Sequence, residues 1–77
     1  MSAHFYNVFA RRDEPAIRCA IIQERPIPFF IQSEAWEFSG TVRPSDPVPR
    51  GFRHQRAEDA TRVVGFYVFL GAPVQRH

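Results

Sequence analysis

The sequence predicts a mostly β or α+β fold: one small antiparallel sheet or open barrel of four or five strands, with at most one short helix. The chain has one leucine against eight phenylalanines, seven valines and five isoleucines. Aromatic and β-branched side chains suit a pleated, half-buried sheet, whereas helices favour unbranched ones. Short runs of these residues are separated by segments that contain proline or glycine, which is typical of strands joined by turns. The 77 residues predict a single domain, 1–77, with one core.

The first two strands are predicted at residues 4–11 and 16–24, where apolar side chains occupy alternate positions. Between them, residues 12–15 are polar and end in a proline, which favours a turn and therefore a hairpin. The predicted faces are Tyr6, Val8 and Ala10 against Phe5 and Phe9 in the first strand, and Ile17, Cys19 and Ile21 against Arg18, Ala20 and Ile22 in the second.

The middle of the chain predicts an edge or crossover followed by a half-exposed strand. Pro26 and Pro28 cannot donate to a sheet ladder, so the segment that holds them is not a central strand. Residues 34–43 then alternate cleanly. That alternation places Trp36, Phe38, Gly40 and Val42 together on one face.

The last third combines a loop, a polar segment and an apolar strand. Residues 44–51 form a proline-rich loop, and residues 54–62 fit either a short exposed helix or an extended polar loop. Residues 62–70 are apolar on both alternating faces, which predicts a central strand that is covered on both sides. Because one short helix offers little cover, either the sheet curls into a barrel or a partner subunit covers the second face.

Charge and cysteine content indicate a soluble protein of a reducing compartment. The formal net charge is +2, carried by ten arginines and no lysine, which is a weaker excess than nucleic-acid binders usually show. No apolar stretch approaches the roughly 20 residues of a membrane span. Cys19 is the only cysteine, so no disulfide within the chain is expected. We therefore expect a cytoplasmic location.

Catalytic and metal-binding patterns are absent from the sequence, so we expect no enzyme, metal or cofactor. There is no nucleophile elbow, glycine-rich phosphate loop, Cys-x-x-Cys or His-x-x-x-His. The nearest catalytic candidates are His54 and Glu58, which would share a helix face, and Cys19. A surface contact for the pair and a core position for the cysteine are the simpler interpretations.

Arginines concentrate between residues 43 and 56, where one acidic residue, Asp46, leaves a local charge of +3. Arginines with an interleaved aromatic side chain can grip phosphates and stack on a base. The alternative is a solvated loop whose arginines pair with nearby acids. The candidate partner-binding residues of this arginine segment are Arg43, Arg50, Phe52, Arg53 and Arg56.

A second candidate surface is the apolar stretch that follows Arg25. Ile27, Phe29 and Phe30, on the segment expected to be an edge, would form an exposed patch of the kind that marks protein contacts. The alternative is that these side chains fold over the sheet and fill the core.

These patterns favour a small non-enzymatic binding module that acts through a protein partner, as an accessory subunit or inhibitor of a larger complex, or through self-association into a homo-oligomer. The alternative hypothesis is a nucleic-acid-binding module that uses the arginine segment. An enzyme that uses His54, Glu58 or Cys19 is the third and least favoured hypothesis.

Overall fold

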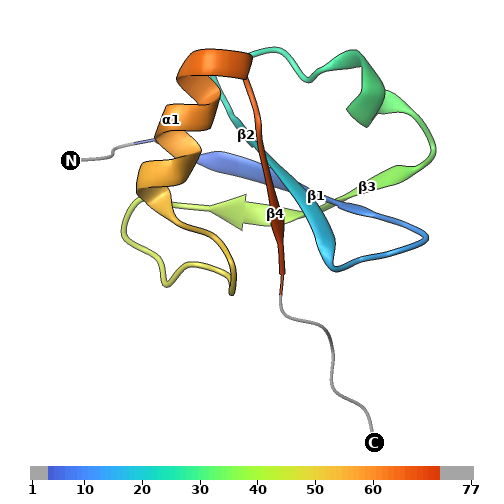
Figure 1. Cartoon of the computed structure of the whole chain (residues 1–77), viewed down its shortest axis with the longest axis horizontal. Helices are drawn as coiled ribbons and strands as arrows, with labels where there is room; N and C mark the ends of the chain where they lie inside the picture. Colours follow the sequence, from blue (N-terminus) through green and yellow to red (C-terminus); the bar gives the residue numbers. More distant parts are fainter. Residues whose placement is uncertain (1–3, 72–77) are drawn as a thin grey trace, which may run out of the picture.

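The computed structural model describes residues 4–71 and confirms the predicted fold class: one antiparallel sheet with one α-helix packed on it (Figure 1). The sheet has the strand order β3-β1-β2-β4 and does not close into a barrel. The helical elements are η1, a 3-10 helix at Phe29–Gln32, and α1 at His54–Val64. The strands are β1 (Tyr6–Arg11), β2 (Ile17–Ile22), β3 (Trp36–Val42) and β4 (Tyr67–Leu70).

The predicted hairpin is confirmed and forms the centre of the sheet. β1 and β2 pair antiparallel from Tyr6 opposite Ile22 to Ala10 opposite Arg18. The turn is closed where the Ile17 amide donates to the Glu14 carbonyl at 2.9 Å. The alternation within both strands is also as predicted, because one set of side chains packs under α1 and the other lies on the opposite face.

The two faces of the sheet are covered unequally. α1 packs over the main core, which holds Tyr6, Val8, Ala20, Ile22, Val42, Phe52, Ala57, Tyr67 and Phe69. On the opposite face, which we call the open face, η1 inserts Ile31 against Cys19 and Ile21. In Figure 1, η1 (green) lies at the far side of the sheet from α1 (orange) and covers one part of the open face. The remainder has no covering element among the described residues.

β3 departs from the predicted alternation because it contains a β-bulge. Phe38 lies opposite Phe9, but the next paired position sets Gly40 opposite Val8, so Ser39 is the extra residue. A bulge adds one residue to one strand and shifts the alternation beyond it. Gly40 has a φ of 151°, which glycine adopts more readily than other residues. Val42 is consequently buried in the main core, on the face opposite Trp36 and Phe38.

The prediction of one central strand over residues 62–70 is wrong. α1 continues to Val64, and Gly65 ends it in the left-handed region with φ 92°. The Gly65 amide donates to the Ala60 and Thr61 carbonyls, as expected of a helix-ending glycine. The strand that follows, β4, is four residues long and lies at the edge of the sheet. Both faces of β4 are apolar, but only one of them packs under α1, and the other remains exposed.

The hydrogen-bond register of β4 decides which main-chain groups are free. The Gly71 amide donates to the Ala16 carbonyl at 2.7 Å, and Leu70 stands opposite Ile17 in the same ladder. Because hydrogen-bonded and non-hydrogen-bonded pairs alternate in an antiparallel ladder, Tyr67 and Phe69 bond to β2. The main-chain groups of Val68 and Leu70 therefore point away from the sheet.

Candidate functional site

The sequence-predicted surface at Ile27, Phe29 and Phe30, which we call the η1 patch, is exposed in the structure. Phe29 is 90% exposed, and Ile27 and Phe30 are each 40% exposed. In contrast, Ile31 on the same 3-10 turn is buried. A turn of three residues sends consecutive side chains in different directions, so one side chain anchors η1 while Phe29 points to solvent.

Hydrogen bonds on both sides hold the η1 patch in place. The Ile31 amide donates to the Pro28 carbonyl at 3.0 Å. The Gln32 side-chain amide donates to the Ile27 carbonyl at 3.0 Å, and the Ser33 hydroxyl donates to the Phe30 carbonyl at 3.0 Å. Pro28, which has a fixed φ, precedes the turn. The exposed rings therefore stand on a restrained backbone.

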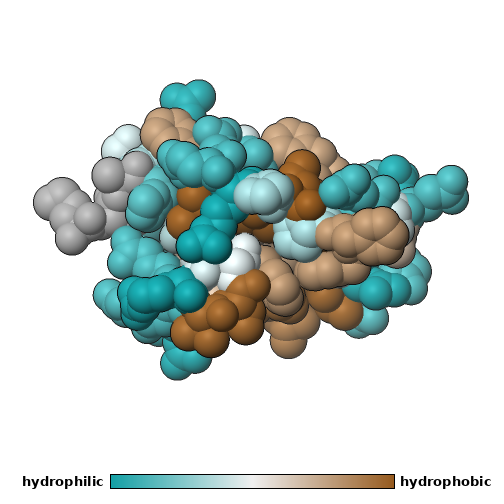
Figure 2. Space-filling view, turned by 90° about the horizontal axis from the view of Figure 1, so that it is seen from above, coloured by the Kyte–Doolittle hydropathy of each residue, from teal (hydrophilic) through white to brown (hydrophobic). Residues whose placement is uncertain are grey.

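Aromatic contacts extend the η1 patch towards the sheet and the end of α1. The Phe30 ring lies edge-on to Phe66, with centroids 5.1 Å apart, and to Trp36 at 6.1 Å. Val63 and Val64, in the last turn of α1, are also exposed. Figure 2, which views the molecule from the side of η1 and the end of α1, shows hydrophobic side chains gathered between hydrophilic margins.

The open face adds exposed apolar residues that the sequence analysis did not single out. Phe38, Phe9, Cys19 and Val68 form one row across all four strands, as the pairings show. The two ends of the row are exposed, with Phe38 at 58% and Val68 at 50%, and Leu70 in the next row reaches 69%. The alternation of apolar residues over 67–70 could have indicated this exposed surface, but it was interpreted as a strand that is covered on both faces.

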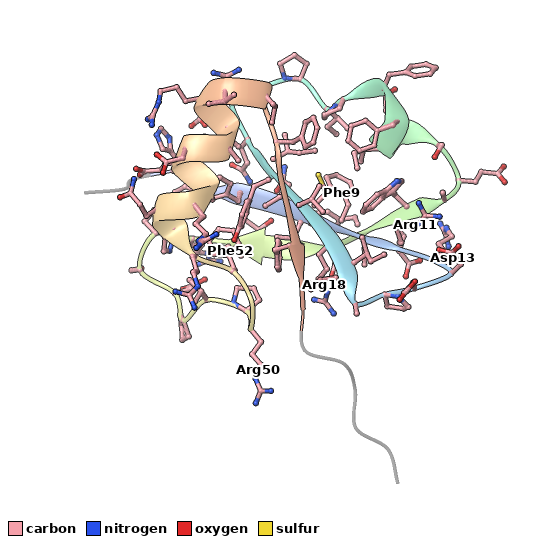
Figure 3. The ribbon with its side chains drawn as sticks, viewed as in Figure 1. Phe9, Arg11, Asp13, Arg18, Arg50 and Phe52 are labelled. Carbon is pink, nitrogen blue, oxygen red and sulfur yellow. The ribbon has the colours of Figure 1, made fainter. Side chains whose placement is uncertain are left out.

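The arginine segment lies elsewhere, and Phe52 does not share its surface. Phe52 is only 3% exposed and lies edge-on to Tyr6, Tyr67 and Phe69, with centroids 5.4–5.5 Å apart. Figure 3 shows Phe52 directed into the molecule and Arg50 directed away from it. A ring in this position is not available to stack on a base.

The four arginines of the segment differ in their surroundings. Arg43 pairs with Asp46 at 3.8 Å. Arg50, Arg53 and Arg56 are exposed and form no ion pair within residues 4–71. Arg53 and Arg56 line the same groove beside β4, whereas Arg50 does not. The structure thus separates the η1 patch from Arg53 and Arg56 in the groove, and leaves Arg43 and Arg50 outside both.

Two of the three catalytic candidates, Cys19 and His54, pack against buried side chains. Cys19 is buried, and burial raises the pKa of its thiol to about 11, which keeps it in the unreactive protonated form. His54 packs edge-on to Phe52 at 5.2 Å, and its Nδ1 atom is buried without a hydrogen-bond partner in the described residues. No hydrogen bond joins it to Glu58, so this pair lacks the contact that orients a general base.

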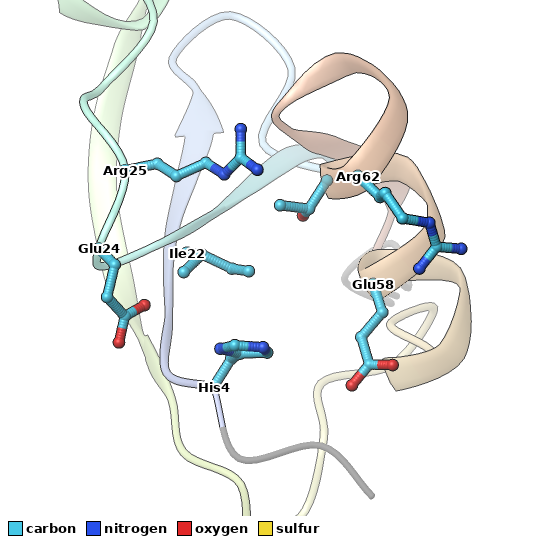
Figure 4. A pocket seen from close by; sticks show the side chains of 7 residues that line it. His4, Ile22, Glu24, Arg25, Glu58 and Arg62 are labelled. Atoms are coloured by element: carbon cyan, nitrogen blue, oxygen red, sulfur yellow. The ribbon is translucent and has the colours of Figure 1, made fainter.

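A cavity of about 630 Å³ lies between the start of β1, the end of β2 and α1. Figure 4 shows Glu24 and Glu58 on opposite walls, His4 below them and the Arg62 side chain directed away along α1. Thr61, at its inner wall, has a buried hydroxyl that finds no partner of hydrogen-bond geometry among residues 4–71, and so does Tyr6. Burial, followed by the nearby Glu58 carboxylate, raises the pKa of Tyr6.

Two further findings bear on the class of site. Within residues 4–71, no three His, Cys, Asp or Glu side chains are grouped so that they could hold a metal ion. None of the helices in that range has the length and apolar character that a membrane span requires.

Comparison with protein-family models, with curated proteins and with solved structures found no match to this chain.

Proposed function

We propose that the chain is a small non-enzymatic protein-binding module that docks the η1 patch onto a partner, as an accessory subunit or inhibitor of a larger complex does. The observation that carries the proposal is Phe29, a large apolar side chain that is 90% exposed on a restrained turn. Burying a side chain of this kind contributes about 1.5–3 kcal/mol. Exposed aromatics on a fixed backbone lose little entropy on binding and are typical interface anchors.

The alternative, nucleic-acid binding through the arginine segment, has weaker support. Arg50, Arg53 and Arg56 offer charge for phosphates, but Phe52 is buried in the main core. Single-strand binding combines such charge with aromatic stacking, and only the charge is present here. A labelled single-stranded oligonucleotide tests this alternative, because phosphate-driven binding weakens steeply as salt rises.

The test of the proposal compares Phe29→Ser with Val48→Ser. Both remove an exposed apolar side chain, but Val48 lies in the 44–51 loop, away from η1 (Figure 1). Sedimentation velocity shows whether a second copy is the partner. For any other protein partner, affinity enrichment identifies it, and calorimetry with the purified partner then measures the affinity of each variant. Phe29→Ser should weaken binding by about tenfold or more, and Val48→Ser should not. The proposal is contradicted if Phe29→Ser leaves the affinity for the partner unchanged and the chain binds the oligonucleotide instead.

A further inference from the structure

The outer edge of β4 presents main-chain groups that are unpaired within the part of the chain that the structure describes. Among the described residues, β4 pairs with β2 alone, and the register leaves the amide and carbonyl of Val68 directed outward. Gly51 lies against the Leu70 carbonyl so closely that a Cβ on it would be 2.0 Å from that oxygen, so the loop shields that end of the edge. Natural proteins usually protect an edge with charge, proline or a covering element. Within residues 4–71, no strand pairs with the outer side of Val68, and the charged residues that line the same groove are Arg53 and Arg56.

A groove of about 410 Å³ runs beside this edge, between Tyr67–Leu70 and the residues that precede and begin α1. Arg53 and Arg56 are the charged residues that line it, and neither has an ion-pair partner among residues 4–71. A second groove adjoins it, because Arg56 and Tyr67 line both. The one acidic residue there, Asp59, is held by Arg62 at 2.7 Å. The α1 side of the edge is therefore basic.

The other side of the same edge is apolar. Val68 and Leu70 project onto the open face and are 50% and 69% exposed. Residues of a strand alternate between the two faces of a sheet. A strand placed beside β4 would therefore direct one set of side chains towards the two arginines and the other set beside Val68 and Leu70.

We propose that the β4 edge accepts an extended segment of a partner protein in which acidic and apolar residues alternate, and that this segment adds a fifth strand to the sheet. Main-chain hydrogen bonds to Val68 supply the pairing, as in other cases of strand addition. Carboxylates facing Arg53 and Arg56, and apolar side chains beside Val68 and Leu70, supply the selectivity. The proposal concerns a surface separate from the η1 patch, so either can fail without the other.

A second copy that pairs through its own β4 does not satisfy this chemistry. The segment Tyr67–Leu70 carries no acidic residue, so pairing two β4 edges would bring arginines of like charge towards each other. A nucleic acid would satisfy the arginines but not the strand edge, because it has no peptide groups to continue the ladder. The two grooves and the free edge together favour a peptide strand.

The test uses the whole chain and three fluorescein-labelled peptides of equal length. The first peptide alternates valine with glutamate, and the second replaces each glutamate with lysine. The third has the sequence of the first, with methyl groups on the main-chain amides that would otherwise donate to β4. Fluorescence anisotropy should show binding of the first peptide and at least about tenfold weaker binding of the other two. Amide exchange in the complex with the first peptide should be slowed at Val68.

Matched protein variants test the role of the groove. Arg53→Glu with Arg56→Glu should weaken binding of the glutamate peptide about tenfold or more, whereas Arg25→Glu with Arg43→Glu, the same change of charge away from β4, should not. Equal binding of the N-methylated peptide would exclude strand addition. Equal loss in both double variants would show that net charge alone attracts the peptide. Arginine-dependent binding of a labelled single-stranded oligonucleotide without peptide binding would also overturn the proposal.

Discussion

Phe52 shows how a residue's sequence neighbours can mislead about its position. It stands between Arg50 and Arg53, which suggested a stacking side chain in a basic loop. In the structure the loop turns Phe52 inward at α1, where it contacts aromatic side chains from β1 and β4. The local sequence does not specify this direction, because the partners lie more than a dozen residues away along the chain.

Phe52→Ala should lower the free energy of unfolding by about 3–5 kcal/mol, because the ring is buried in the main core and its loss leaves a cavity. Arg53→Ala should change it by less than about 0.5 kcal/mol, since its side chain is exposed and has no ion-pair partner within residues 4–71. Urea denaturation of both variants measures the difference. A Phe52→Ala protein as stable as the parent would show that the ring is not part of the core.

Cys19 predicts a loss of stability at alkaline pH. Burial raises the pKa of its thiol from 9.0 to about 11, so above pH 9 the unfolded state releases a proton that the folded state keeps. The free energy of unfolding should therefore fall between pH 9 and pH 11. Tyr6, whose pKa is also raised by burial, acts in the same direction. Denaturation across this range, with Cys19→Ala as the control, should show a smaller fall in the variant; identical profiles would contradict the assignment.

At the scale of elements, regular alternation was predictable and its interruptions were not. β1 and β2 have the faces that the sequence indicates, because no bulge or turn interrupts their period of two. In β3 the bulge at Ser39 moves Val42 to the other face. At residues 62–70, the apolar alternation suggested one strand, whereas a helix ends within this range. Gly65 was the available sign, because glycine commonly ends helices in the left-handed region.

Alanine substitutions at the three glycines with positive φ distinguish the cost of backbone strain from the cost of a steric clash. Gly40→Ala and Gly65→Ala should each cost about 1–3 kcal/mol of stability, because alanine disfavours these φ values although space is available. Gly51→Ala should cost more than either, because its Cβ would also meet the Leu70 carbonyl at 2.0 Å. Thermal melting of the three variants ranks them. A Gly51→Ala protein that melts with or above the other two would mean that the loop does not pack on β4.

At the scale of the whole molecule, the composition indicates more apolar side chains than one small core can enclose. α1 covers one face of the sheet, and η1 covers only part of the other. The exposed side chains of Ile27, Phe29 and Phe30 lie where the sequence placed a candidate surface. Val68 and Leu70 were missed, because whether a strand is central or at an edge depends on pairings between distant segments.

The most direct test of the proposed function is photo-crosslinking from position 29. A photoreactive phenylalanine analogue replaces Phe29, and in a control protein it replaces Val48, which is also exposed but lies outside the η1 patch. Irradiation in cells that make the chain should give a discrete protein adduct from position 29 that is absent from position 48. The same adducts from both positions, or none from position 29, would contradict a binding surface at η1.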